Sequence, residues 1–143
     1  MKKLTCAVTI LLAFCSVAQQ APPVLRGSWL ATAGPKQVFR GRWSAQVLPG
    51  TKNAAHGSWI LLNASNQIVL EGTWSARKSA RGWQGTWSGR TQKGGSMSGT
   101  WEAADTDGFN GKTFEDLLKR TAEKQIAGSW QSRRAQGNWW LQR

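Results

Sequence analysis

Residues 128–139 read Gly-Ser-Trp-Gln-Ser-Arg-Arg-Ala-Gln-Gly-Asn-Trp, so the tripeptide Gly-x-Trp stands at both ends of this stretch. If the chain turns midway, Trp130 faces Gly137 and Gly128 faces Trp139. A large indole needs space, which the missing side chain of glycine supplies, and the indole in turn covers the glycine backbone. The stretch therefore predicts a hairpin of two antiparallel strands with both indoles on one face.

The same tripeptide occurs eight times in the 143 residues. Its tryptophans are 14, 16, 15, 13, 14, 29 and 9 residues apart, and five of these seven gaps suit one strand followed by a short loop. The motif glycines are Gly27, Gly41, Gly57, Gly72, Gly85, Gly99, Gly128 and Gly137. This repetition predicts eight strands in sequence.

Apolar and polar residues alternate around each motif. Ile68, Leu70, Gly72 and Trp74 share one face of their segment, while Glu71 lies on the other. A period of two with one apolar face is typical of antiparallel strands that cover a core. A helix is excluded, because residues two apart point to nearly opposite sides of it.

Eight sequential strands with short connections predict an all-β fold, an eight-stranded antiparallel up-and-down meander that closes into a barrel. Closure requires stagger, so some neighbouring strands must pack diagonally. Such a barrel is just wide enough to be filled by side chains or to hold one small ligand. The inward tryptophans are the candidate ligand-binding residues: Trp29, Trp43, Trp59, Trp74, Trp83, Trp87, Trp101, Trp130 and Trp139.

The gap of 29 residues holds a different element. Thr113 can cap a helix, with an acidic residue three positions on as a weak capping-box partner. Phe114, Leu117 and Leu118 then share one side, so the pattern predicts a short amphipathic helix over 114–125, between the sixth and seventh strands.

A few apolar residues break the polar pattern of the outward face: Leu30, Ile60, Leu62, Val69 and Trp140. A turn centred on residues 65 and 66 places Leu62 opposite Val69 and Ile60 opposite Glu71. We expect the helix to cover this exterior patch through its three apolar side chains. The alternative is that the helix plugs one end of the barrel.

Residues 1–18 have the features of a secretory signal peptide. Two lysines precede a short apolar run, and small residues end at Ala18, where we expect cleavage. The run is too short to favour a membrane anchor, and Phe14 before Cys15 disfavours lipidation. The prediction is a secreted or periplasmic protein with a linker over 19–24 and a barrel domain over 25–143.

Both cysteines lie within the predicted signal peptide, so the mature chain has no thiol for disulfides, catalysis or metal binding. Its charge is large: removing Lys2 and Lys3 from the total of +12 leaves +10. This charge suggests attraction to anionic lipid or polysaccharide of the cell envelope. Nucleic acid is disfavoured, because its recognition needs aromatic residues on the basic face. The candidate contacts to an anionic surface are Arg40, Arg42, Arg77, Arg90, Arg133 and Arg134.

No catalytic or metal-binding set is visible in the sequence, so we expect no enzymatic activity and no cofactor. His56, the single histidine, faces outward without a placed carboxylate, and Glu71 and Glu102 are expected to form exposed salt bridges. Residues 105–111 resemble part of a calcium loop, but Phe109 stands where an oxygen ligand belongs. A polar turn before the helix is the expected structure there.

Gly27-Ser28-Trp29, near the first strand, resembles the calycin group of lipocalins, fatty-acid-binding proteins and avidins. The resemblance implies an up-and-down barrel that binds a small molecule at an open end. The chain departs from that group by repeating the motif in every strand and by placing its helix before the seventh strand. The resemblance therefore carries the architecture and no binding residue.

Three functional hypotheses follow. The first is a non-enzymatic barrel that binds a small apolar or aromatic ligand through the inward tryptophans, with an unknown oligomeric state. The second is a filled structural or adhesion module whose basic exterior contacts anionic envelope components. The third is a small outer-membrane barrel with the tryptophans facing lipid, because alternation alone does not distinguish inside from outside. The absence of tyrosine and the glycines on the Trp face count against this third hypothesis.

Overall fold

The computed structural model describes residues 24–47, 50, 53–103, 113–120 and 125–142. Within these ranges, no helix has the length and apolar character that crossing a membrane requires. The elements are β1 Val24–Ala33, β2 Gln37–Val47, β3 Ala54–Leu62, β4 Ile68–Ser79, β5 Gly82–Thr91, β6 Ser96–Ala103, α1 Phe114–Arg120, β7 Ile126–Ser132 and β8 Gln136–Gln142.

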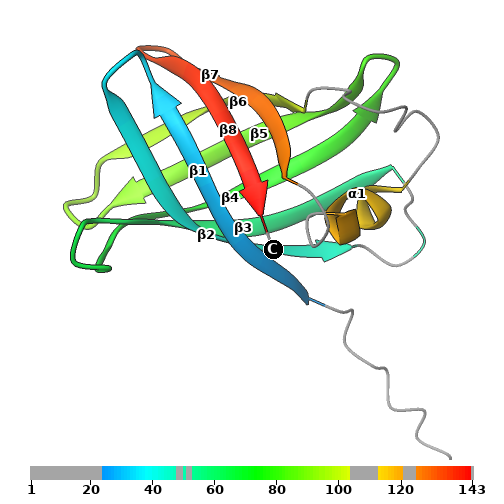
Figure 1. Ribbon diagram of the computed structural model, residues 1–143, viewed down its shortest axis with the longest axis horizontal. Helices are drawn as coiled ribbons and strands as arrows, with labels where there is room; N and C mark the ends of the chain where they lie inside the picture. The colour runs from blue at the N-terminus through cyan, green and yellow to red at the C-terminus, as the bar shows by residue number, and fades with distance from the viewer. Residues whose placement is uncertain (1–23, 48–49, 51–52, 104–112, 121–124, 143) are drawn as a thin grey trace, which may run out of the picture.

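The eight strands form one closed antiparallel barrel. Each strand pairs with the next in sequence, and β8 pairs back to β1 (Figure 1). This confirms the predicted all-β meander barrel with one helix between β6 and β7, and it agrees with the architecture that the calycin resemblance implies. The predicted signal peptide and nearly all of the predicted linker lie outside the described residues.

Glycine faces tryptophan across each hairpin that joins an odd-numbered strand to the next strand. In the β1–β2 hairpin, Trp29 pairs with Gly41 and Gly27 pairs with Trp43. The same reciprocal pairing recurs between β3 and β4, between β5 and β6, and between β7 and β8. The predicted pairing of Gly-x-Trp segments is therefore confirmed.

Between hairpins the register shifts, which supplies the stagger that closure needs. In the β2–β3 pair, Trp43 lies opposite Trp59 instead of a motif glycine. The stagger can be measured by stepping from each residue to its paired partner on the next strand, once around the barrel. Starting at Val24 on β1, these steps lead to Gln136 on β8. The β1–β8 register, extended, pairs Gln136 with Gly34, so one turn around the barrel shifts the position along β1 by ten residues.

The two ends of the barrel differ. The odd-numbered strands run toward one end, which we name the turn end because it holds the turns at 34–36, 63–67, 92–95 and 133–135. The opposite end, named the helix end, holds α1. In Figure 1 the turn end lies at the left and α1 at the right.

Helix α1 begins with a reciprocal capping box. Thr113 Oγ1 accepts a hydrogen bond from the Asp116 N–H at 3.2 Å, and Asp116 Oδ2 accepts one from the Thr113 N–H at 3.1 Å. The structure describes the helix over Phe114–Arg120, and Gln125 is not helical. The rest of the predicted helix, residues 121–124, lies outside the described residues.

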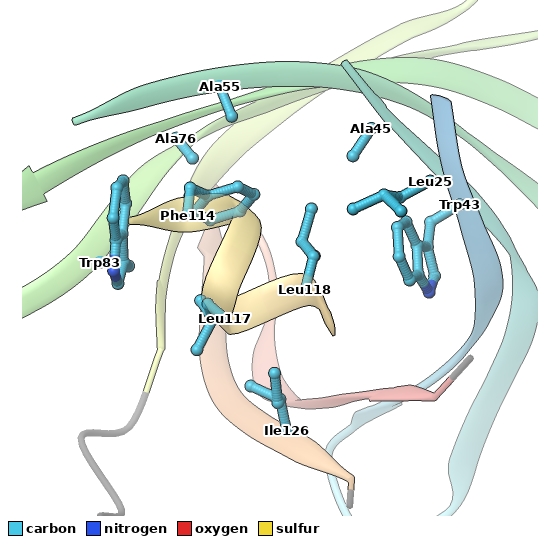
Figure 2. Packing of buried hydrophobic residues seen from close by; sticks show 10 residues of the cluster. All are labelled: Leu25, Trp43, Ala45, Ala55, Ala76, Trp83, Phe114, Leu117, Leu118 and Ile126. Atoms are coloured by element: carbon cyan, nitrogen blue, oxygen red, sulfur yellow. The ribbon is translucent and has the colours of Figure 1, made fainter. Parts of the chain in front are cut away.

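Helix α1 plugs the helix end of the barrel. Phe114, Leu117 and Leu118 are 3%, 5% and 1% exposed and pack with wall residues that include Leu25 and Ile126. Figure 2 shows these side chains pointing from the helix toward the surrounding strands. The expectation that the helix covers the exterior patch is therefore wrong, because the barrel's end offers its apolar face a deeper burial.

A β-bulge near the turn end also changes the expected register. Ile60 lies opposite Glu71 as predicted, but Leu62 pairs with Ile68 instead of Val69, because the register shifts between Leu61 and Leu62. The shift brings Ile68 beside outward-facing Leu62, although alternation alone places Ile68 on the inward face. Ile68 is 43% exposed.

Candidate functional site: two tiers of indoles

The order of Gly and Trp within the motif sorts the indoles into two tiers. Because Trp follows Gly by two residues, the indole lies nearer to the end toward which its strand runs. The turn-end tier comes from the odd-numbered strands and comprises Trp29, Trp59, Trp87 and Trp130. The helix-end tier comes from the even-numbered strands and comprises Trp43, Trp74, Trp101 and Trp139.

The turn-end indoles contact one another edge to face. The ring centroids of Trp29 and Trp59 are 6.0 Å apart, those of Trp59 and Trp87 are 6.2 Å apart, and those of Trp87 and Trp130 are 5.9 Å apart. These residues stand on strands that are next-but-one neighbours. Side chains of such strands meet only inside the barrel, so the motif indoles point inward.

Two of the helix-end indoles, Trp74 and Trp101, contact Phe114. Its ring centroid lies 5.5 Å from that of Trp74 and 6.5 Å from that of Trp101, and the Trp101 ring lies 5.8 Å from Trp139. Trp83, at the start of β5, packs 4.7 Å from Phe114 and is 3% exposed. Phe114 therefore forms a floor beneath the helix-end tier, and Trp83 is part of the packing around that floor.

Four indoles donate over the glycine of the neighbouring strand to a carbonyl of the strand beyond. Trp74 passes over Gly57 and donates from Nε1 to the Ser44 oxygen on β2 at 3.1 Å. A Cβ atom at Gly57 would collide with both that oxygen and the Trp74 ring, so the bond requires glycine there. The equivalent bonds run from Trp43 to Gln142, from Trp101 to Ser75 and from Trp130 to Thr32.

Three further indoles donate to the adjacent strand of their own hairpin. The acceptors are backbone oxygens at 2.9–3.2 Å: Arg42 for Trp29, Thr73 for Trp59 and Ser129 for Trp139. Seven of the eight motif indoles are thus held by a hydrogen bond to the backbone as well as by packing. The aromatic walls of the barrel are preorganised.

Trp87 breaks this pattern. Its Nε1 is buried and has no hydrogen-bond partner among the described residues, and the same holds for Trp83. An unsatisfied buried donor costs about 1–3 kcal/mol, so such a group in a native structure calls for a partner or a function. Trp87 belongs to the turn-end tier, whereas Trp83 packs against the plug.

The inward indoles are not sealed from solvent. Of the eight motif tryptophans only Trp43 is buried, and the other seven are half-buried although they point into the barrel. Met97, which shares the inward face of β6, is 44% exposed at the turn end. Water therefore reaches part of the indole surface in both tiers.

The outward face is polar around most of the barrel. Hydroxyl groups bond across neighbouring strands, with oxygens 2.7 Å apart between Ser44 and Ser58 and 2.9 Å apart between Ser75 and Thr86. The six predicted arginines are all exposed, but they are spread over both ends of the barrel. Arg40 and Arg42 are on β2, Arg77 near the helix end of β4, Arg90 on β5, and Arg133 and Arg134 in the β7–β8 turn.

The other candidates for chemistry stand apart from one another. His56 is exposed, and its Nε2 lies 3.1 Å from Gln46 Oε1. Glu71 and Glu102 are exposed on β4 and β6. Among the described residues no group of three His, Cys, Asp or Glu side chains could hold a metal ion. The segment that resembles a calcium loop lies outside those residues.

The sequence identifies Phe114 as part of an apolar helix face but does not place it beneath the helix-end tier, where it contacts Trp74 and Trp101. Its spacing with Leu117 and Leu118 identifies an apolar helix face but not the surface that this face meets.

Comparisons with protein-family models, with curated proteins and with solved structures find no match to the chain.

Proposed function

We propose that the protein is a non-enzymatic barrel that binds a small apolar or aromatic ligand on its inward indoles, entered from the turn end. The observation that carries the proposal is that seven inward motif indoles keep solvent-accessible surface. Concave sites lined by aromatic side chains with few polar groups are typical of small-molecule binding. The predicted signal peptide would place this binder outside the cytoplasm.

The rigidity of the indoles supports the same function. Backbone hydrogen bonds and edge-to-face contacts hold the turn-end tier before any ligand arrives. A wall that is ordered in advance loses little conformational entropy on binding, so more of the contact energy contributes to affinity.

The free N–H of Trp87 narrows the ligand class. A ligand with one hydrogen-bond acceptor beside an apolar or aromatic body would satisfy this buried donor. The ligand would be bounded by Trp59 and Trp130, the two indoles that contact Trp87. Met97 has a flexible side chain that can move aside at the turn end.

The alternative functions fit the arrangement less well. In a filled module the inward indoles would be buried by packing against one another, whereas seven of them are half-buried. A barrel in lipid would expose its Ser44–Ser58 and Ser75–Thr86 hydroxyl pairs and the Arg42 guanidinium to hydrocarbon, which is costly. These features favour a barrel that works in water.

Quinoline and naphthalene provide a matched test, because the two molecules have the same bicyclic outline and only quinoline carries an acceptor nitrogen. We expect both to shift the indole N–H signals of the turn-end tier in ¹H–¹⁵N spectra. Quinoline should bind about five-fold more tightly, since one hydrogen bond contributes about 1 kcal/mol. In Trp87→Phe this preference should disappear, whereas Trp140→Phe, which changes an outward indole, should retain it.

Two results would overturn this assignment. If neither compound perturbs the turn-end indoles at millimolar concentration, the barrel is a filled module and the ligand-binding function is rejected. If both bind but Trp87→Phe keeps the preference for quinoline, the barrel binds ligands and the role of the Trp87 N–H is wrong.

A further inference from the structure

An apolar strip crosses one side of the barrel's exterior near the turn end. Five outward residues lie in one continuous row of strand pairing, from Trp140 on β8 through Leu30, Arg40 and Leu62 to Ile68 on β4. Apolar side chains from the row and from the neighbouring outward positions form what we name the exterior strip: Leu30, Ile60, Leu62, Ile68, Val69 and Trp140.

The exterior strip is partly exposed and one-sided. Leu30 and Ile68 are each 43% exposed and Val69 is 36% exposed, whereas Ile60, Leu62 and Trp140 are half-buried. Helix α1, which could have covered these residues, packs into the helix end instead. The outward residues of β5 and β6, on the other side of the barrel, are all polar: Gln84, Thr86, Ser88, Arg90, Ser96, Ser98, Thr100 and Glu102.

Cationic groups stand within and beside the strip. Arg42 lies directly opposite Ile60, and Arg40 lies between Leu30 and Leu62. Arg40 Nη2 donates to the Asn63 oxygen at 2.9 Å, which fixes its charge beside the β3–β4 turn. The carboxylate of Glu71 borders this area opposite Ile60, and Arg90 lies opposite Glu71 on the next strand. The whole chain carries a net charge of +12.

We propose that the exterior strip docks on the surface of a bilayer that contains anionic lipids. Each strand of the closed barrel has a paired neighbour on both sides, so the wall offers no edge strand for a peptide to extend. Exposed aliphatic side chains can enter the boundary between headgroups and acyl chains, and an indole such as that of Trp140 prefers this depth. The arginines beside them meet lipid phosphates.

A second copy of the chain fits this surface less well than a bilayer does. In a symmetric dimer the same patch meets itself, so Arg40 and Arg42 of one copy would approach those of the other. Like charges across an interface are unfavourable. The docking proposal does not depend on ligand binding inside the barrel, because its residues face outward.

Vesicle flotation tests the proposal with a matched pair of variants. Arg42→Gln and Arg77→Gln remove the same charge, but Arg77 is exposed near the helix end, away from the strip. On vesicles of three parts phosphatidylcholine to one part phosphatidylglycerol, we expect Arg42→Gln to weaken binding about five-fold, since one arginine near such a surface contributes about 1 kcal/mol. Arg77→Gln should bind nearly as well as the unchanged protein.

The lipid composition separates charge from apolar contact. On pure phosphatidylcholine the difference between Arg42→Gln and the unchanged chain should vanish, while Leu30→Ser and Ile68→Ser should weaken binding on both compositions. All variants share the apolar run at 4–14, so differences between them report on the strip. Their far-ultraviolet circular dichroism and melting temperature should match the unchanged protein, because these side chains are exposed.

Equal losses in Arg42→Gln and Arg77→Gln would mean diffuse charge attraction without a docking face, which overturns the proposal. So would vesicle binding that Leu30→Ser and Ile68→Ser leave unchanged. If those two variants instead abolish a dimer seen by sedimentation, the occupant of the strip is a second copy of the chain and the bilayer is rejected.

Discussion

At four of the motif indoles, a glycine on the neighbouring strand lets three strands share one interaction. The Trp101 indole crosses Gly85 and donates to the Ser75 oxygen on the third strand at 3.0 Å. A Cβ atom at Gly85 would collide with that oxygen. Glycine costs stability in a strand because it gains no side-chain packing. In this barrel the cost is offset by an indole that both fills the space and bonds across it.

Gly128→Ala tests this use of glycine at the residue scale. The added Cβ would collide with the Glu102 oxygen and the Trp139 ring, so we expect a loss of about 1–3 kcal/mol in unfolding free energy. Ser129→Ala, at the exposed middle position of the same motif, should change the unfolding free energy by less than about 0.5 kcal/mol. Urea titration measures both. Equal effects of the two variants would show that the glycine is not required for packing.

The sequence alone predicts the Gly–Trp pairing but not the hydrogen-bond acceptors of the indoles. The pairing of Trp130 with Gly137 depends only on a short turn, which is local. The acceptor of Trp130 is the Thr32 oxygen, 98 residues away in sequence. That contact exists only once β8 has closed on β1 with a defined stagger, so no local pattern encodes it.

Among the elements, strands and helix differ in how far the sequence determines their place. The period of two identifies the inward face of each strand, since Trp and Gly mark it repeatedly. The spacing of Phe114, Leu117 and Leu118 identifies an apolar helix face, but any apolar surface could receive it. The apolar face of α1 packs in the barrel's end instead of on the exterior strip, because the end encloses its side chains and leaves Leu118 only 1% exposed.

Leu118→Ala tests the plug at the element scale. Truncation of a buried leucine costs about 2–5 kcal/mol, so the melting temperature should fall clearly. Leu30→Ala, on the exposed exterior strip, removes the same atoms and should cost less than about 1 kcal/mol, because Leu30 is 43% exposed. Calorimetry of both variants gives the comparison. A stable Leu118→Ala protein would mean that α1 does not plug the barrel.

At the scale of the whole molecule, closure converts repeated local pairs into one structure. The number, order and direction of the strands follow from eight motifs and their gaps. The stagger of ten residues per turn around the barrel does not follow from them. It arises where strands of different hairpins pair, as in the β2–β3 pair, where Trp43 lies opposite Trp59.

Hydrogen exchange of the ten indole N–H groups, followed by ¹H–¹⁵N spectra, tests the central claim most directly. If the motif indoles lie inside the barrel and donate to backbone oxygens, the seven bonded N–H groups should exchange about 100-fold more slowly than that of outward Trp140, or slower still. Exchange of those seven at the rate of Trp140 would contradict the account, since it would place the indoles in solvent.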